Sequence, residues 1–329
     1  MLCARRNGRG RRGRSSASLC YSPGVTLVTS HAPLIAGLTR SRLSLALGSL
    51  IVGLFVFCAL FAPLLSALIG YDPYEQVAPR SVSPPTPPSR DNWFGTDTLG
   101  RDLLSRLLFG ARVSLEVGVV AEAIALFIGT GLGAVAGYAG GRTDAFLMRA
   151  TDLVLAFPAP LLALAIIAAV PEPETAPLLR ILPHPSVGIV FLVLGCLGWA
   201  GIARLVRAEF LRLREQEFAQ AAQAMGAHGS RVILRHLLPN ALRPLIVIGT
   251  LGIGGNILME AWLSFLGVGA RPPLPSWGGM VTEGQTYFLA KPWVCLAPGL
   301  AILLVVLGFN LLGDAIGDRL DPRRRQRLA

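Results

Sequence analysis

The sequence has few charged residues. Only 15% of its 329 residues are Asp, Glu, Lys or Arg, whereas a soluble domain carries about 25%. The deficit is concentrated in stretches of about 20 residues with almost no charge, and such a stretch crosses a hydrocarbon core about 30 Å thick. Since 53% of the residues are hydrophobic, the scarcity of charge argues against a soluble domain and predicts an all-α, polytopic membrane protein.

Lysine is almost absent, because Lys291 is the only one among 30 basic residues. The formal net charge of +11 is therefore carried by arginines, and these gather beside the ends of the apolar stretches. Binding of nucleic acid would need a soluble domain with a basic face. Retention of arginine on one side of a membrane explains the distribution better, so we expect no nucleic-acid partner.

Motifs for metal binding and catalysis are also missing. No CxxC pair or other metal spacing is formed by the five cysteines, so neither a metal site nor a disulfide framework is expected. The chain contains no H-E-x-x-H or G-x-S-x-G sequence. It has no Walker A loop either, because Lys291 is followed by proline. We therefore expect no catalytic residue, no metal and no ATP site on this chain.

Six apolar stretches are present, and they predict six transmembrane helices. They cover residues 43–69, 113–138, 146–170, 186–203, 244–266 and 295–313. The chain then divides into a disordered basic tail (1–42), a first span with an extracytoplasmic loop and an interfacial helix (43–112), a five-span core (113–320) and a second basic tail (321–329). A start codon downstream of residue 1 is an alternative for the first tail.

The segment between the first two spans is expected to lie outside the hydrocarbon. Its proline-rich stretch, residues 83–88, must be extended. Residues 102–112 place four leucines on one side and Arg106 on another, which predicts a short amphipathic helix in the membrane interface.

Basic residues predict the orientation of the chain. The segments on the side of both termini, with Arg149 at the inner end of the third span, hold 22 Lys and Arg, and the segments on the other side hold 8. Basic residues are retained on the cytoplasmic side. We therefore expect a multi-pass protein of a prokaryotic inner or plasma membrane with both termini in the cytoplasm.

Two patterns within the predicted spans bear on helix packing and on a transport path. Gly129, Gly133, Gly137 and Gly141 recur at every fourth position, which predicts one helix face that packs closely on another helix. The acids Glu122 and Glu260 lie deep in predicted spans, where a charge costs about 2.5–3.5 kcal/mol. Each either lines a transport path or makes a structural hydrogen bond, and the sequence leaves both interpretations open.

The segment 204–243 is the longest inner segment apart from the first tail. Residues 215–225 favour a narrow, alanine-rich helix, and Gly226 permits the positive φ that ends one. Ser230 is expected to cap a second helix, which Pro239 is expected to close. The sequence therefore predicts two short helices joined at Gly226, the first narrow enough for a partner protein to grip.

This segment resembles the EAA loop of ABC importer permeases. The similarity rests on residues 217–226 (EFAQAAQAMG) and 235–240 (RHLLPN), and the chain from about residue 43 resembles the C-type permease subunit of dipeptide, oligopeptide and nickel importers. Further blocks in the same order are FAPLL and YDPY (61–74), FGTDTLGRD (94–102), LSFLG and PSWG (263–278), and FNLLGD and LDP (309–322). Two residues depart from the general motif: Gln220 stands in the place of the glutamate of the Glu-Ala-Ala triplet, and His236 stands in the place of isoleucine. Peptide-type permeases vary at both positions.

The resemblance implies a fold and an assembly. The fold would be that of a type I ABC importer permease with six transmembrane helices and a cytoplasmic coupling helix. The partners would be a second homologous permease, two ABC ATPase subunits or domains that bind ATP and Mg²⁺, an extracytoplasmic substrate-binding protein, and membrane lipid. By resemblance, the ATPase-coupling residues would be Glu217, Ala221, Ala222, Gly226, Arg235 and Pro239.

The sequence bears on four candidate functions. The first is a peptide importer permease, which transports di- or oligopeptides. The second is a permease of the same family for nickel, an opine or another small solute. A membrane-embedded enzyme lacks any catalytic constellation, and a channel or scaffold leaves the loop 204–243 without a purpose. The sequence does not separate the first two.

Overall fold

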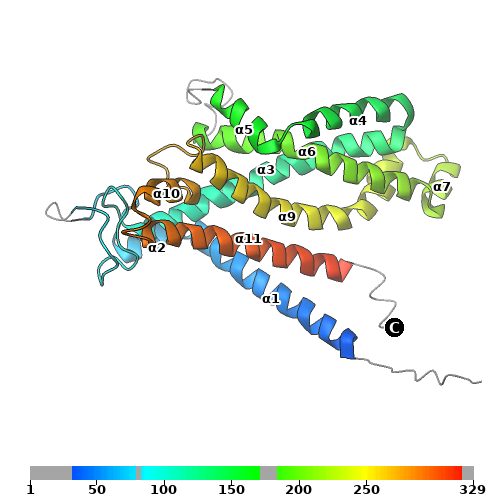
Figure 1. The fold of residues 1–329 in the computed structure, drawn as a ribbon. Helices are drawn as coiled ribbons and strands as arrows, with labels where there is room; N and C mark the ends of the chain where they lie inside the picture. The colour runs from blue at the N-terminus through cyan, green and yellow to red at the C-terminus, as the bar shows by residue number, and fades with distance from the viewer. Residues whose placement is uncertain (1–31, 79–82, 171–183, 321–329) are drawn as a thin grey trace, which may run out of the picture.

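The computed structural model describes residues 32–78, 83–170 and 184–320, and it is built of helices (Figure 1). Within these ranges there is no β-strand, only two isolated bridges between residues 76–102. The elements in chain order are α1 Ala32–Leu60, α2 Ala62–Ile69, α3 Leu103–Ala139, α4 Gly141–Ala156, α5 Ala159–Ala168, α6 Pro185–Arg214, α7 Glu217–Ala224, α8 Gly229–Val232, the π-helical turn η2 Ile233–Leu237, α9 Leu238–Phe265, α10 Trp277–Gly284, the 3₁₀ turn η3 Gln285–Tyr287 and α11 Trp293–Leu320.

Five of these helical stretches are long and apolar enough to cross a membrane, and the pair α4 and α5 makes up to six. The pair bends by 82° at Phe157 and Pro158. Phe157 has an extended backbone (φ −96°, ψ 139°), as expected for a residue before proline. Six apolar spans are therefore confirmed if the bent pair counts as one, although the third is not a straight helix.

The first predicted span, 43–69, is also divided. α1 ends at Leu60, and α2 follows with Pro63 in its first turn. Proline is tolerated there because the first amide groups of a helix have no intrahelical acceptor. By contrast, α3 begins before the apolar stretch that predicted it, and α6 ends after its own. The added turns were left out of the predicted spans because they carry charged residues, such as Arg106 in α3 and Arg212 in α6.

The glycine face packs α3 against α6, as expected for three of its four members. A Cβ built on Gly129 or Gly137 would lie 2.7 Å from the Cβ of Ile202 or Phe210, too close for any side chain. Gly141 was wrongly placed on this face. It lies outside α3, at the start of α4 with φ +57°, and its Cβ would meet nothing within 4 Å.

The prediction of a separate short helix over 102–112 is also wrong. Asp102 caps α3, accepting a hydrogen bond from the amide of Ser105 at 2.7 Å, and α3 then continues to Ala139. Arg106 is only 1% exposed. It can be buried because Asp97, in the segment before α3, and Glu283, on α10, pair with it. A count of leucines around one turn carries no information about such partners.

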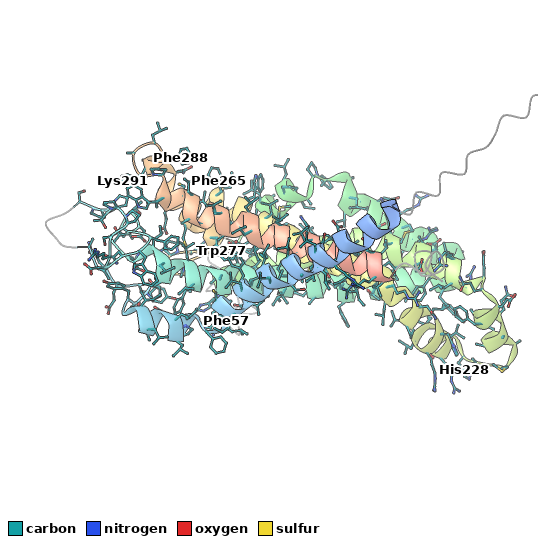
Figure 2. The ribbon with its side chains drawn as sticks, turned by 90° about the horizontal axis from the view of Figure 1, so that it is seen from below. Phe57, His228, Phe265, Trp277, Phe288 and Lys291 are labelled. Atoms are coloured by element: carbon teal, nitrogen blue, oxygen red, sulfur yellow. The ribbon has the colours of Figure 1, made fainter. Side chains whose placement is uncertain are left out.

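The molecule has two distinct ends. α7 lies at one end, and the beginning of α1 and the end of α11 point toward it, while α2, α10 and the segment before α3 form the other end (Figure 1). Figure 2 shows Trp277 inside the bundle, with His228 at the α7 end and Phe288 and Lys291 at the opposite end. We call these the α7 end and the α10 end.

Candidate docking helix and membrane groove

The helix α7 is held on the bundle by its two inner alanines. Ala219 and Ala222 are 0% and 2% exposed. Ala219 belongs to an apolar cluster that contains Phe210 of α6 and Val232 of α8. A larger side chain at Ala222 would therefore disturb the packing of α7 itself, which assigns this residue to positioning rather than to contact with a partner.

The outer face of α7 is unoccupied by the described part of the chain. Glu217, Gln220, Ala221 and Ala224 are all exposed, at the helical spacing that makes one face. Met225, directly after the helix, is 81% exposed. Gln220, one of the two residues that depart from the general motif, donates a hydrogen bond from its amide to the carbonyl of Glu215 at 3.1 Å. It therefore ties α7 to the end of α6.

Gly226 ends α7 as expected, with φ +82° and nothing within 4 Å of a Cβ built there. The second arm differs from its prediction. Ser230 lies inside α8, whose N-cap is His228 without a side-chain cap, and Pro239 lies in the first turn of α9 and does not close a helix. A π-helical turn joins α8 to α9, and Arg235 within it is exposed. The second arm is therefore the start of the fifth span.

A groove of about 740 Å³ runs beside α3, η2 and α9. Apolar and small residues form most of its lining, including Leu126 and Phe127 of α3 and Leu242 and Ile246 of α9. Glu122 is the one ionisable residue among the lining residues. The groove is open along one side, so it offers an apolar surface with a single acid.

Glu122 is 6% exposed and accepts a hydrogen bond from the amide nitrogen of Asn256 at 2.9 Å. Its carboxylate lies against Gly252, where a Cβ would overlap both carboxylate oxygens. Sequence analysis had identified Glu122 but neither Asn256 nor Gly252. The available signal was the cluster of glycines 252, 254 and 255 with an asparagine at the centre of an apolar span.

Glu260 has a different environment. It is 1% exposed and lies outside the groove lining. Ser264 and Ser114 donate hydrogen bonds to its carboxylate at 2.7 and 3.3 Å. The hydroxyl of Ser114 also accepts a hydrogen bond from the backbone amide of Trp277 at 3.4 Å. This geometry favours the structural interpretation for Glu260, because its carboxylate joins α3, α9 and α10.

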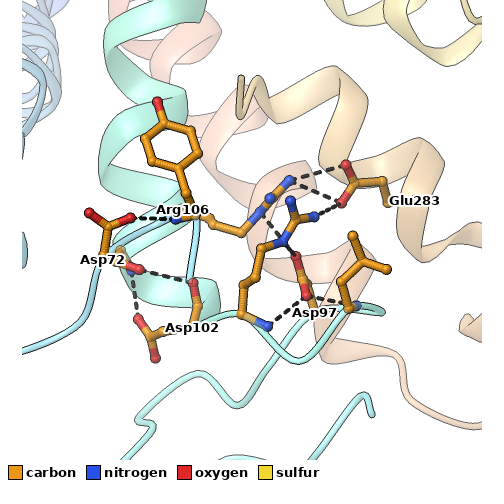
Figure 3. A network of polar contacts seen from close by, with 9 residues as sticks. Asp72, Asp97, Asp102, Arg106 and Glu283 are labelled. Carbon is orange, nitrogen blue, oxygen red and sulfur yellow. Dashed lines mark hydrogen bonds and ion pairs between the residues drawn. The ribbon is translucent and has the colours of Figure 1, made fainter. Parts of the chain in front are cut away.

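A buried ion network lies at the α10 end (Figure 3). Arg106 contacts Glu283 at 3.0 Å and Asp97 at 3.2 Å. Arg101 contacts the same two acids at 3.2 and 2.7 Å. Two arginines therefore share two carboxylates, which fixes the segment before α3 and the start of α3 to α10.

The network continues through polar contacts of the loop, where Asn92 donates to Asp102 at 3.0 Å and the amide of Tyr74 donates to Asp72 at 2.7 Å. Burial, and then the negative charge of Asp72, raise the pKa of the Tyr74 phenol above its ordinary value. Sequence analysis missed this network, because its signal was only an arginine within a leucine run.

Comparisons with known proteins give a consistent result. The family model for the binding-protein-dependent transport system inner membrane component matches residues 129–326. A dipeptide transport system permease protein of Alkalihalophilus pseudofirmus is 41% identical over 288 residues, which are 88% of each chain. An oligopeptide transport system permease protein of Bacillus subtilis is 35% identical and covers 87% of this chain and 88% of its own. A glutathione transport system permease protein of Escherichia coli is 42% identical over 72% of this chain and 74% of its own.

A solved structure shares the fold. The methionine ABC transporter MetNI, in an inward facing conformation, matches with a TM-score of 0.52 and 19% identity. The match covers 67% of this chain and 98% of the other. At this identity the match shows the fold alone, and it confirms the permease fold expected from the sequence.

Proposed function

Because this chain belongs to the family of binding-protein-dependent transport system inner membrane components, we propose that it carries di- or oligopeptides across the membrane together with a second, homologous permease. The family is one of transport permeases, so the chain is a multi-pass membrane subunit of an ABC importer. Peptides are the proposed solutes because the similar permeases are named for dipeptides, oligopeptides and glutathione.

The observation that carries the proposed mechanism is the position of α7. It lies at one extreme of the molecule, its inner alanines fix it to α6 and α8, and its outer face is free of other described residues. Small outer residues such as Ala221 and Ala224 allow a partner to approach the helix backbone closely. We assign this face to an ATPase subunit, since the chain has no phosphate-binding loop of its own.

The path is proposed to follow the groove that Glu122 lines. ATP binding draws the two ATPase subunits together, the α7-type helices of the two permeases move with them, and the spans move between inward and outward opening. ATP can shift this equilibrium only through its different affinity for the two states. α7 transmits that difference because only two residues separate it from α6 and its inner alanines are packed on the bundle.

The α7 end is assigned to the cytoplasm, together with both termini, because most arginines flank that side. The α10 end would then receive the extracytoplasmic binding protein that delivers the solute. ATP and Mg²⁺ are assigned to the ATPase subunits, and this chain acts as a non-catalytic subunit. The ligand carried by the partner binding protein would distinguish peptides from nickel or another small solute.

The docking assignment is tested by two substitutions on α7. Ala221→Trp places a bulky ring on the outer face, whereas Gln223→Trp places the same ring on the flank of the same helix. We expect Ala221→Trp to abolish peptide uptake and peptide-stimulated ATPase activity in proteoliposomes that contain the whole complex, and Gln223→Trp to retain most of both. Equal activity of the two variants would contradict the docking face.

A further inference from the structure

The groove carries one buried carboxylate and no cation to balance it. None of the residues that line the groove is Lys, Arg or His. Among the described residues, Glu122 accepts a side-chain hydrogen bond from the neutral amide of Asn256. An acid at bilayer depth costs about 2.5–3.5 kcal/mol to bury, and a single neutral donor leaves much of its acceptor capacity unused.

The backbone around Glu122 is shaped to hold the carboxylate in place. Gly252 faces it from α9, and any side chain there would occupy the position of the carboxylate. Asn256, one turn further along the same helix, holds one oxygen at 2.9 Å. α9 therefore supplies both the space for the carboxylate and one hydrogen-bond donor. The second carboxylate oxygen accepts no hydrogen bond from the described residues.

We propose that Glu122, positioned by Asn256 and Gly252, binds the cationic nitrogen of the passing solute and so selects for solutes that carry an ammonium or guanidinium group. A peptide offers such a group as its α-ammonium or as a lysine or arginine side chain. The surrounding lining is apolar, so a charge-assisted hydrogen bond to Glu122 is the main polar contact available to the solute. This inference rests on the proposed path.

The test uses the complete complex in proteoliposomes, with Glu122→Gln as the variant. Glu116→Gln is the matched control, because Glu116 lies on the same helix, is exposed and does not line the groove. We expect Glu122→Gln to lower uptake of a cationic peptide about ten-fold or more, the factor that one charged hydrogen bond contributes. Glu116→Gln should leave uptake unchanged.

Two probes separate the sources of the cation. Alanyl-alanine carries only an α-ammonium, and N-acetyl-alanyl-lysine carries only a side-chain ammonium. A loss for either probe in Glu122→Gln supports the inference and identifies which nitrogen is bound. Unchanged uptake of both probes overturns it. Absence of ATP-dependent peptide uptake in the unmodified complex would instead refute the proposed function.

A second variant covers the case in which Glu122→Gln does not assemble. Thr130→Lys places a cation on the groove wall formed by α3 and leaves the contact between Glu122 and Asn256 in place. The added charge should repel the solute cation and occupy the carboxylate, so uptake of alanyl-alanine should fall by a similar factor. An assembled Thr130→Lys complex with normal uptake overturns the inference.

Discussion

The contact between α3 and α6 can be tested with two alanine substitutions two residues apart. Gly133 faces α6, where a Cβ would lie 2.5 Å from the carbonyl oxygen of Ala203 and 2.7 Å from the Cβ of Val206. Gly131 lies on the same helix, and its Cβ would meet nothing within 4 Å. The two sites therefore differ in packing and not in secondary structure.

The expected free energies follow from this difference. Alanine in place of glycine favours a helix by about 1 kcal/mol, and this gain applies to both sites. Overpacking costs about 1–3 kcal/mol and applies to Gly133 alone, because a backbone carbonyl cannot rotate out of the way. Gly133→Ala should therefore be less stable than Gly131→Ala by about 1–3 kcal/mol.

The measurement is the unfolding of the purified chain in mixed detergent micelles, followed by helical circular dichroism as the denaturing detergent is increased. The midpoint for Gly133→Ala should fall below that of the unmodified chain or equal it, and the midpoint for Gly131→Ala should rise. If the two variants unfold at the same midpoint, the glycines do not set the distance between α3 and α6.

Three further predictions concern other contacts. Glu283→Gln should lower the stability of the complex by about 2–3 kcal/mol. This loss is smaller than for a fully buried pair because Glu283 is 27% exposed. Adding Arg106→Met to Glu283→Gln should recover part of the loss in a thermal melt. Gly226→Val should reduce uptake while Gly226→Asn is tolerated, since φ is +82° and only the backbone conformation opposes a side chain. Trp277→Phe should lower the melting temperature more than Trp293→Phe, because Trp277 donates to a carbonyl of α3 at 3.1 Å whereas the indole nitrogen of Trp293 has no partner among the described residues.

The sequence predicted the features that depend on local pattern. Apolar length gave the spans, the four-residue spacing gave the contact of Gly129, Gly133 and Gly137 with α6, and the glycine at 226 gave the end of α7. Each of these depends on one helix and its immediate geometry. The resemblance to importer permeases added the fold, which the comparisons confirmed.

The features that were missed depend on pairing between distant residues. Arg106 was expected at a membrane surface. Its pairing with Glu283 was missed because Glu283 lies on α10, far along the chain. Pro239 was expected to end a helix, but proline is equally compatible with a first turn, and the packing of η2 on the bundle decided between the two. Sequence also could not separate Glu122 from Glu260, because only the fold shows which of them faces the groove.

The short connection between α6 and α7 has a consequence for how the chain tolerates insertions. Only Glu215 and Gln216 separate the two helices, so the direction in which α7 faces is set by the phase at which α6 ends. One residue added to the last turn of α6 would rotate everything that follows by about 100°, turning Ala221 away from the side it now presents. The length of α6 therefore determines how α7 and its binding partner are oriented relative to the spans.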